Sequence, residues 1–107
     1  MNPMEFNPSQ LAEELKPRLS EALHLTSSDR TENSFYLQAP ERVEEDKILD
    51  AINSFLDQQG YATDPQHHGS VLILGEERCL GWVTITNFSG QDPYLIMITV
   101  TKAPRRQ

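Results

Sequence analysis

The chain has 107 residues, which is enough for one domain built around one hydrophobic core. Its formal net charge of −7 opposes contact with phosphate groups, so we expect no nucleic-acid partner and no membrane-surface partner. No stretch approaches the ~20 apolar residues that a transmembrane helix needs, and the N-terminal residues lack the basic and apolar parts of a targeting segment. A single cysteine allows no internal disulfide, and together these features predict a cytoplasmic protein.

The first predicted element is an amphipathic helix over about 8–24. Asn7 and Pro8 mark its start, because an asparagine side chain can accept a hydrogen bond from a free backbone amide and proline at the first helical position loses no needed donor. Apolar residues then recur at helical spacing and form one face: Leu11, Leu15, Leu19, Ala22 and Leu23. Pro17 interrupts this pattern and predicts a kink, or a split into two helices, near Lys16.

A loop, a short strand and a second helix follow. Residues 26–33 are rich in turn formers and are predicted to form a loop, whereas residues 34–38 are predicted to form a short strand. The helix over about 41–59 has five apolar residues on one face: Val43, Ile48, Ile52, Phe55 and Leu56. Acidic residues crowd its first turns, and Gly60 is placed to end it.

Beyond Gly60 the pattern changes from helical to strand-like. Four β-rich segments cover residues 61–64, 70–74, 79–87 and 93–102. The turns between them are short, which favours an antiparallel meander, because parallel strands need longer crossover connections. The predicted fold class is therefore α+β: an antiparallel meander of about four to five strands, with the main helix over 41–59 packed on one face and the N-terminal helical segment over 8–24. We expect one domain over 1–107, with disordered ends at 1–7 and 103–107.

Side chains alternate between the two faces of the predicted sheet. One face carries Tyr94, Ile96, Ile98 and Val100 from the last strand, and Cys79, Gly81, Val83 and Ile85 from the strand before it. This face is the expected seat of the helix over 41–59. The opposite face carries Leu80, Trp82, Leu95 and Met97, which also need cover. Either the N-terminal leucines cover them, which is favoured because those leucines must themselves be buried, or another protein surface does, from a second copy or from a partner.

Residues 67–79 include the residue types that bind metals or attack substrates. His67 and His68 are adjacent, so their side chains diverge in a turn instead of converging on a metal ion, and Gly69 supplies the backbone angle that such a turn needs. Cys79 as a nucleophile would require a histidine base and a third group to orient that base, and the local sequence matches no such arrangement. We therefore expect no catalytic residue, no cofactor and no metal site.

Carboxylates are concentrated on or near the helix over 41–59: Glu41, Glu44, Glu45, Asp46, Asp50 and Asp57. General acid–base catalysis needs carboxyl groups held in a cleft, whereas a run of acids along a helix is usually a solvated face. Its functional alternative is a negative surface that binds a basic partner.

These features predict a small, acidic, non-enzymatic protein-binding or accessory domain that acts through a surface, with another protein or a second copy as its partner. The candidate surfaces are the apolar sheet face, with Trp82, Leu95 and Met97, and the acidic helix, with Glu41, Glu44, Glu45 and Asp50. Two alternatives stay open. One is an inhibitor or immunity-type protein that masks a basic partner, and the other is a small-molecule-binding or metal-binding domain that uses residues 67–79.

Overall fold

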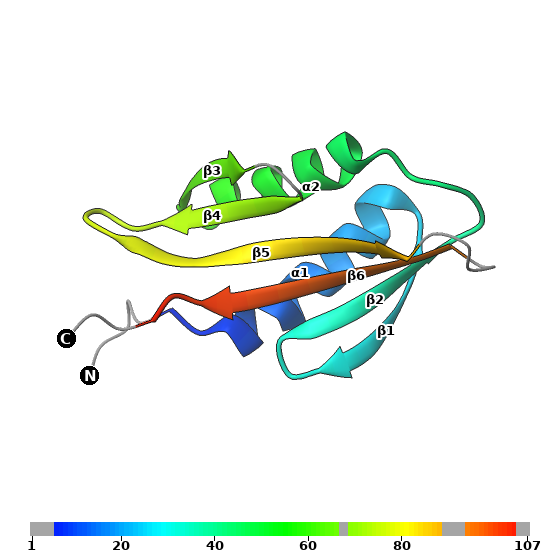
Figure 1. Ribbon diagram of the computed structural model, residues 1–107, viewed down its shortest axis with the longest axis horizontal. Coiled ribbons are helices and arrows are strands. Elements are labelled where there is room, and N and C mark those ends of the chain that lie inside the picture. The colour runs from blue at the N-terminus through cyan, green and yellow to red at the C-terminus, as the bar shows by residue number, and fades with distance from the viewer. Residues whose placement is uncertain (1–5, 67–68, 89–93, 105–107) are drawn as a thin grey trace.

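The computed structural model describes residues 6–66, 69–88 and 94–104, and these form an α+β fold (Figure 1). In chain order the elements are α1 (Pro8–Leu23), β1 (Thr26–Thr31), β2 (Ser34–Ala39), α2 (Glu45–Gln58), β3 (Ala62–Gln66), β4 (Ser70–Leu74), β5 (Cys79–Phe88) and β6 (Tyr94–Lys102). The strands form one antiparallel sheet in the order β1-β2-β6-β5-β4-β3. The predicted fold class is confirmed, with six strands instead of four to five.

The additional strand is β1, in the segment that was predicted to be a loop. Its residues are all polar, which favours a loop, and most of them are exposed. The segment nevertheless forms a strand because it pairs with the apolar strand β2, from Thr26 opposite Gln38 to Thr31 opposite Ser34, with a shift in register at Arg30. Strand formation here depends on the neighbouring strand more than on the residues' own preference.

The predicted meander is confirmed for β3 to β6, in which each strand pairs with the next. Strand β6 then pairs with β2 on its other side, so β5 and β6 are the two central strands. Helix α2 carries the chain from β2, near one edge of the sheet, to β3 at the opposite edge.

Helix α1 begins as predicted: the Asn7 side chain accepts a hydrogen bond from the backbone amide of Gln10 at 3.2 Å, and Pro8 occupies the first helical position. Pro17 does not split the helix, which is continuous from residue 8 to residue 23. Proline costs the helix one backbone hydrogen bond, and burial of the leucine face offsets that cost. The buried residues of this face are Leu11, Ala12, Leu15 and Leu19.

Helix α2 begins at Glu45, four residues later than predicted, because residues 40–44 form the connection that leaves β2. Four of the five predicted apolar residues are buried on α2, and Val43 packs against the core from the connection. The helix ends as predicted before Gly60, which has a φ of 89° and donates its amide to the Asp57 carbonyl at 3.0 Å.

Both helices cover the same face of the sheet (Figure 1). One core cluster joins the leucines of α1 and the apolar face of α2 to the inward residues of the strands, including Val83, Ile96 and Val100. The favoured expectation that the N-terminal leucines cover the second sheet face is therefore wrong. The reason is that α1 also packs against α2, and this contact holds both helices in one layer.

The chain ends that were expected to be disordered lie partly outside the described residues, which begin at residue 6 and stop at residue 104. Phe6 is buried, and its ring contacts Tyr61 edge to face, with 6.2 Å between ring centroids. At the other end, Ala103 donates its backbone amide to the Leu80 carbonyl at 3.0 Å.

Candidate functional site

The outer face, defined as the side of the sheet that is turned away from both helices, carries apolar side chains that the described helices do not cover. Seven of its side chains are large and apolar or aromatic: Tyr36, Leu72, Leu74, Trp82, Phe88, Leu95 and Met97. Phe88 is 37% exposed and the other six are half-buried. Among the described residues, no helix or strand lies over this face (Figure 1).

Strand pairing arranges these side chains in two groups. In the first group Met97 lies opposite Tyr36, and Leu95 lies opposite Phe88. In the second group Trp82 lies opposite Leu72, with Leu74 two residues further along β4. A row of hydroxyl side chains runs across the sheet between the groups, from Ser34 through Thr99 and Thr84 to Ser70.

The outer face of the four inner strands carries no lysine, arginine, histidine, aspartate or glutamate. Its outward positions are Ser34, Tyr36 and Gln38 on β2; Leu95, Met97, Thr99 and Thr101 on β6; Cys79, Trp82, Thr84, Thr86 and Phe88 on β5; and Ser70, Leu72 and Leu74 on β4. The chain has nine lysines and arginines and sixteen aspartates and glutamates, so an uncharged surface of this width is unusual for it. Among the residues that the structure describes, charged side chains occur on this face only at the two edge strands. Asp64 on β3 lies opposite Leu72, and Arg30, which lies at the register shift in β1, donates a hydrogen bond to the outward residue Ser34.

Simple alternation placed Leu80 on the same face as Trp82 and Cys79 on the helix side, and both predictions are wrong. The pairing shifts at the end of β4, so that the outward residue Leu74 lies opposite Cys79. Leu80 is therefore the extra residue of a β-bulge, and its side chain packs against the core on the helix side. A bulge depends on both strands, so the sequence of β5 alone does not reveal it.

Of the three predicted outer-face residues that remain, Leu95 and Met97 lie in the first apolar group and Trp82 in the second. Four further outer-face residues were not predicted: Tyr36, Leu72, Leu74 and Phe88. The first three each alternate with a buried neighbour in their strand, whereas Phe88 follows the exposed residue Asn87. Recognising that these four belong to the same surface required the order of the strands, because β2 and β6 are far apart in the sequence but adjacent in the sheet.

The acidic residues lie on the other side of the molecule from the outer face. Glu41, Glu44, Glu45, Asp46, Asp50 and Asp57 are all exposed. The buried face of α2 packs on the inner face of the sheet, so the carboxylates of Asp46, Asp50 and Asp57 lie on the solvent side of the helix. Glu45 is the exception, because its carboxylate reaches Gly69, the residue before β4. The two predicted binding surfaces, the apolar sheet face and the acidic helix, therefore lie on different sides of the molecule.

The residues considered for chemistry do not form a cluster in the described part of the chain. His67 and His68 lie outside the described residues. Cys79 is half-buried, and its thiol donates a hydrogen bond to the Gly81 carbonyl at 3.3 Å. Within residues 6–66, 69–88 and 94–104, no three His, Cys, Asp or Glu side chains are placed to hold a metal ion.

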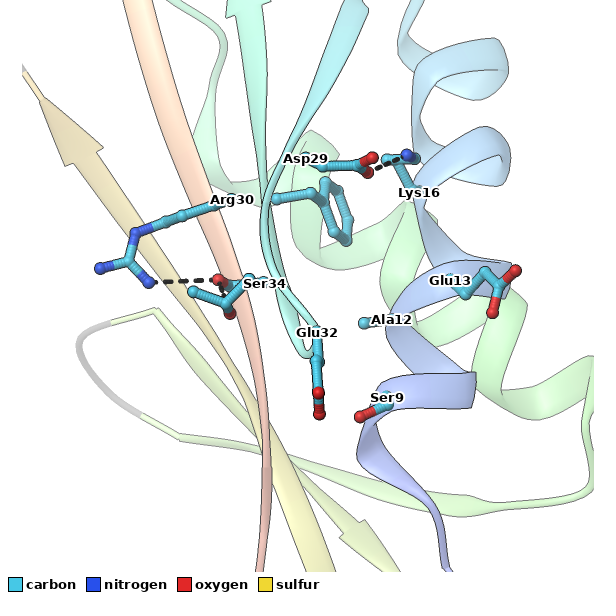
Figure 2. Close-up of a pocket in the computed structure, with 10 residues that line it drawn as sticks. Ser9, Ala12, Glu13, Lys16, Asp29, Arg30, Glu32 and Ser34 are labelled. Atoms are coloured by element: carbon cyan, nitrogen blue, oxygen red, sulfur yellow. Dashed lines mark hydrogen bonds and ion pairs between the residues drawn. The ribbon is translucent and has the colours of Figure 1, made fainter.

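A cleft of about 440 Å³ lies between α1 and the hairpin formed by β1 and β2. Figure 2 shows Asp29 turned toward Lys16, with which it forms an ion pair, and Arg30 turned away from the helix. The cleft is open and is lined by charged side chains, including Glu13 and Glu32, and by the aromatic side chain of Phe35. A ligand pocket is usually more enclosed and more apolar, so we interpret the ion pair as a contact that ties α1 to the edge strand. An ion pair this exposed stabilises the fold by about 0–1 kcal/mol.

Comparison with known proteins adds no functional information: no family description, curated protein or solved structure matches the chain. In the part of the chain that the structure describes, neither helix is both long and apolar enough to cross a membrane.

Proposed function

We propose that the chain is a non-enzymatic protein-binding domain and that its outer face is the binding surface. The observation that carries this proposal is the uncharged, partly aromatic surface that extends over four inner strands without cover from the described elements. Exposed apolar groups on a small domain favour an interaction site, and tryptophan, tyrosine, phenylalanine and methionine are enriched at the centres of protein interfaces.

The composition of the surface is compatible with two states, one free in water and one packed in a complex. The threonines at positions 84, 86, 99 and 101 present both a methyl and a hydroxyl group, so the face can be hydrated when free and packed when covered. The two apolar groups around Trp82 and Met97 then provide the side chains whose burial stabilises the complex.

The test is a pair of substitutions, Trp82→Glu and Met97→Glu, each at the centre of one apolar group. Because neither side chain belongs to the core cluster, each variant is expected to keep its free energy of unfolding within about 1 kcal/mol of the wild type. Each is expected to lose association with the partner, because a carboxylate would be buried without a counter-charge. Association is measured by capture of partners from the cells that produce the protein.

Ala22→Glu is the matched control, because it adds the same charge at an exposed position of α1 on the helix side. This variant should keep both its fold and its partner. If Trp82→Glu and Met97→Glu unfold the domain, the two side chains are structural and the proposal loses its basis.

The acidic helix is the second candidate surface, favoured by the exposure of all six carboxylates between residues 41 and 57. Such a surface would bind a basic partner, as an inhibitor does, and its association rate would fall as salt is added. The double substitution Glu44→Gln and Asp50→Asn would then weaken capture, and high salt would abolish it. Capture through the outer face should survive both changes.

A further inference from the structure

We propose that the occupant of the outer face is a second copy of this chain, packed face to face about a twofold axis that runs parallel to β5 and β6 and between them. This inference rests on the proposed function, since it names the partner of the same surface. It is argued from three properties of the face: the charges at its two edges, the pairing of its central strands and its area.

The two charged side chains of the outer face have opposite signs and lie at opposite edges. Arg30 on β1 points away from α1 (Figure 2), and its Nη1 donates a hydrogen bond to Ser34 Oγ at 3.2 Å. Asp64 on β3 lies opposite the outward residue Leu72 and is exposed. The strand order places four strands between these two side chains, and the outward residues of those four strands are uncharged.

This charge pattern selects one twofold arrangement over another. An axis parallel to the central strands places β1 of one copy over β3 of the other, so Arg30 of each copy faces the edge that carries Asp64 of the other. An axis in the same plane but perpendicular to the strands would place Arg30 against Arg30 of the second copy. Only the first arrangement is electrostatically self-complementary, as a twofold interface must be.

Arg30 and Asp64 lie at nearly the same level along the strand direction. Arg30 lies beside Ser34, in the row of Thr99, and Asp64 lies in the row of Thr101. The two rows are two residues apart, which is about 7 Å along a strand. An extended arginine side chain can span such an offset, so two equivalent ion pairs would close the two edges of the interface.

The same axis places the central strands of the two copies over each other and brings one apolar pair together. It exchanges β5 and β6, so two residues that are paired across these strands in one copy face each other between copies. Leu95 would then face Phe88 of the second copy, and Trp82 would face Thr101 of the second copy. Leu95 and Phe88 of one copy would thus pack against Phe88 and Leu95 of the other copy, with the strands in the positions that the structure shows.

The area of the face approaches that of a standard protein interface. Six strands at a spacing of about 4.8 Å extend ~24 Å across the sheet, and the two central strands extend ~30 Å. The face is therefore at most ~700 Å², because the other four strands have five or six residues each. A standard protein interface buries about 800 Å² on each partner. A sheet-on-sheet contact would also leave the helices and their carboxylates at the outside of the dimer, where the negative charges of the two copies are farthest apart.

The experiment is measurement of solution mass by light scattering over a range of protein concentrations, on the wild type and on charge-reversal variants. The wild type is expected to be a dimer. Arg30→Glu and Asp64→Arg should each weaken dimerisation by about tenfold or more, because each reversal places like charges at both edges. The double variant, Arg30→Glu with Asp64→Arg, should restore the dimer.

Mixing the two single variants provides the sharpest test. In a mixed dimer, the carboxylate introduced at position 30 of one copy would meet the guanidinium introduced at position 64 of the other. At the second edge the unchanged Asp64 and Arg30 would meet, so both edges would again pair opposite charges. The two variants should therefore form a heterodimer that is at least about tenfold tighter than the homodimer of either variant alone. Arg42→Glu and Asp57→Arg are matched controls, because they make the same charge changes at exposed positions outside the sheet and should leave the dimer intact.

Trp82 offers an independent readout, because it is the single tryptophan of the chain and lies on the outer face. Its fluorescence should shift to shorter wavelength as the dimer forms with rising concentration. Circular dichroism reports whether each variant folds. Should Arg30→Glu fail to fold after losing its bond to Ser34, Arg30→Gln removes the charge while keeping a donor at that position.

Two outcomes would overturn the inference. A wild type that is monomeric at every concentration shows that the occupant is not a second copy, and the proposed function is then decided separately by capture with Trp82→Glu and Met97→Glu. A dimer that withstands Arg30→Glu, Asp64→Arg and Trp82→Glu alike uses another surface.

Discussion

Gly81 lies where strand β6, the ring of Phe6 and the bulge at Leu80 come close together. A Cβ atom at this position would clash with the Thr101 carbonyl of β6 and would lie 2.8 Å from the ring of Phe6. Gly81 also follows the bulge residue Leu80. The requirement at this position is therefore for space, because backbone and a buried aromatic ring occupy the volume that any side chain would need.

Gly81→Ala is expected to destabilise the fold by about 1–3 kcal/mol, the usual cost of overpacking a core. The free energy of unfolding, measured by urea denaturation, tests this expectation. Gly75→Ala is the matched control, since a Cβ at Gly75 would meet only the Leu80 side chain, at 3.2 Å, and that side chain can shift. Equal losses in the two variants would contradict the packing argument.

Among the secondary-structure elements, α1 and β1 show how packing and pairing override local preference. Pro17 lies inside α1, yet the helix is continuous because Leu15 and Leu19 on either side of it are fully buried. Strand β1 is made of polar residues, yet it pairs with β2. Polar residues are tolerated there because the strand lies at the edge of the sheet and most of its side chains stay exposed to water. In both elements a local penalty is smaller than the stabilisation from tertiary contacts.

Replacing Pro17 with alanine should therefore stabilise the protein. Proline in a helix interior costs about 3 kcal/mol relative to alanine, and part of this gain is lost because alanine leaves the unfolded chain more flexible. A net gain of about 1–2 kcal/mol is expected, which is measured as a rise in the midpoint of thermal unfolding. Pro8→Ala, at the first helical position, removes a proline that carries no such cost and should bring no comparable gain.

Taken as a whole, the molecule has two layers: the helices form one and the sheet forms the other. All the buried apolar side chains of the described residues join the helices to the inner face, apart from Ala39, which is buried on β2 outside the joined cluster. The outer face has no second layer in the described part of the chain. A two-layer domain of this kind buries one face of its sheet internally and leaves the other face without a second layer.

Leucine-to-alanine substitutions on the two sides should distinguish the layers. Leu19 is fully buried between the helices and the sheet, so Leu19→Ala is expected to cost about 2–5 kcal/mol of unfolding free energy. Leu95 is half-buried on the outer face, and Leu95→Ala should cost less than about 1 kcal/mol in the monomer. Denaturation at protein concentrations low enough to avoid association provides the comparison, and a reversed order would show that α1 does not belong to the core.

Apolar spacing within continuous segments was enough to predict the fold class, both helices, the β3–β6 meander and the inward residues Tyr94, Ile96, Ile98 and Val100. The other features depend on contacts between segments that are distant in the sequence. Pairing between strands distant in sequence created β1, moved Leu80 to the core side and brought Tyr36 beside Met97. Packing between helices placed α1 in the same layer as α2, and that placement is what leaves the outer face, with its opposite charges at Arg30 and Asp64, without a second layer.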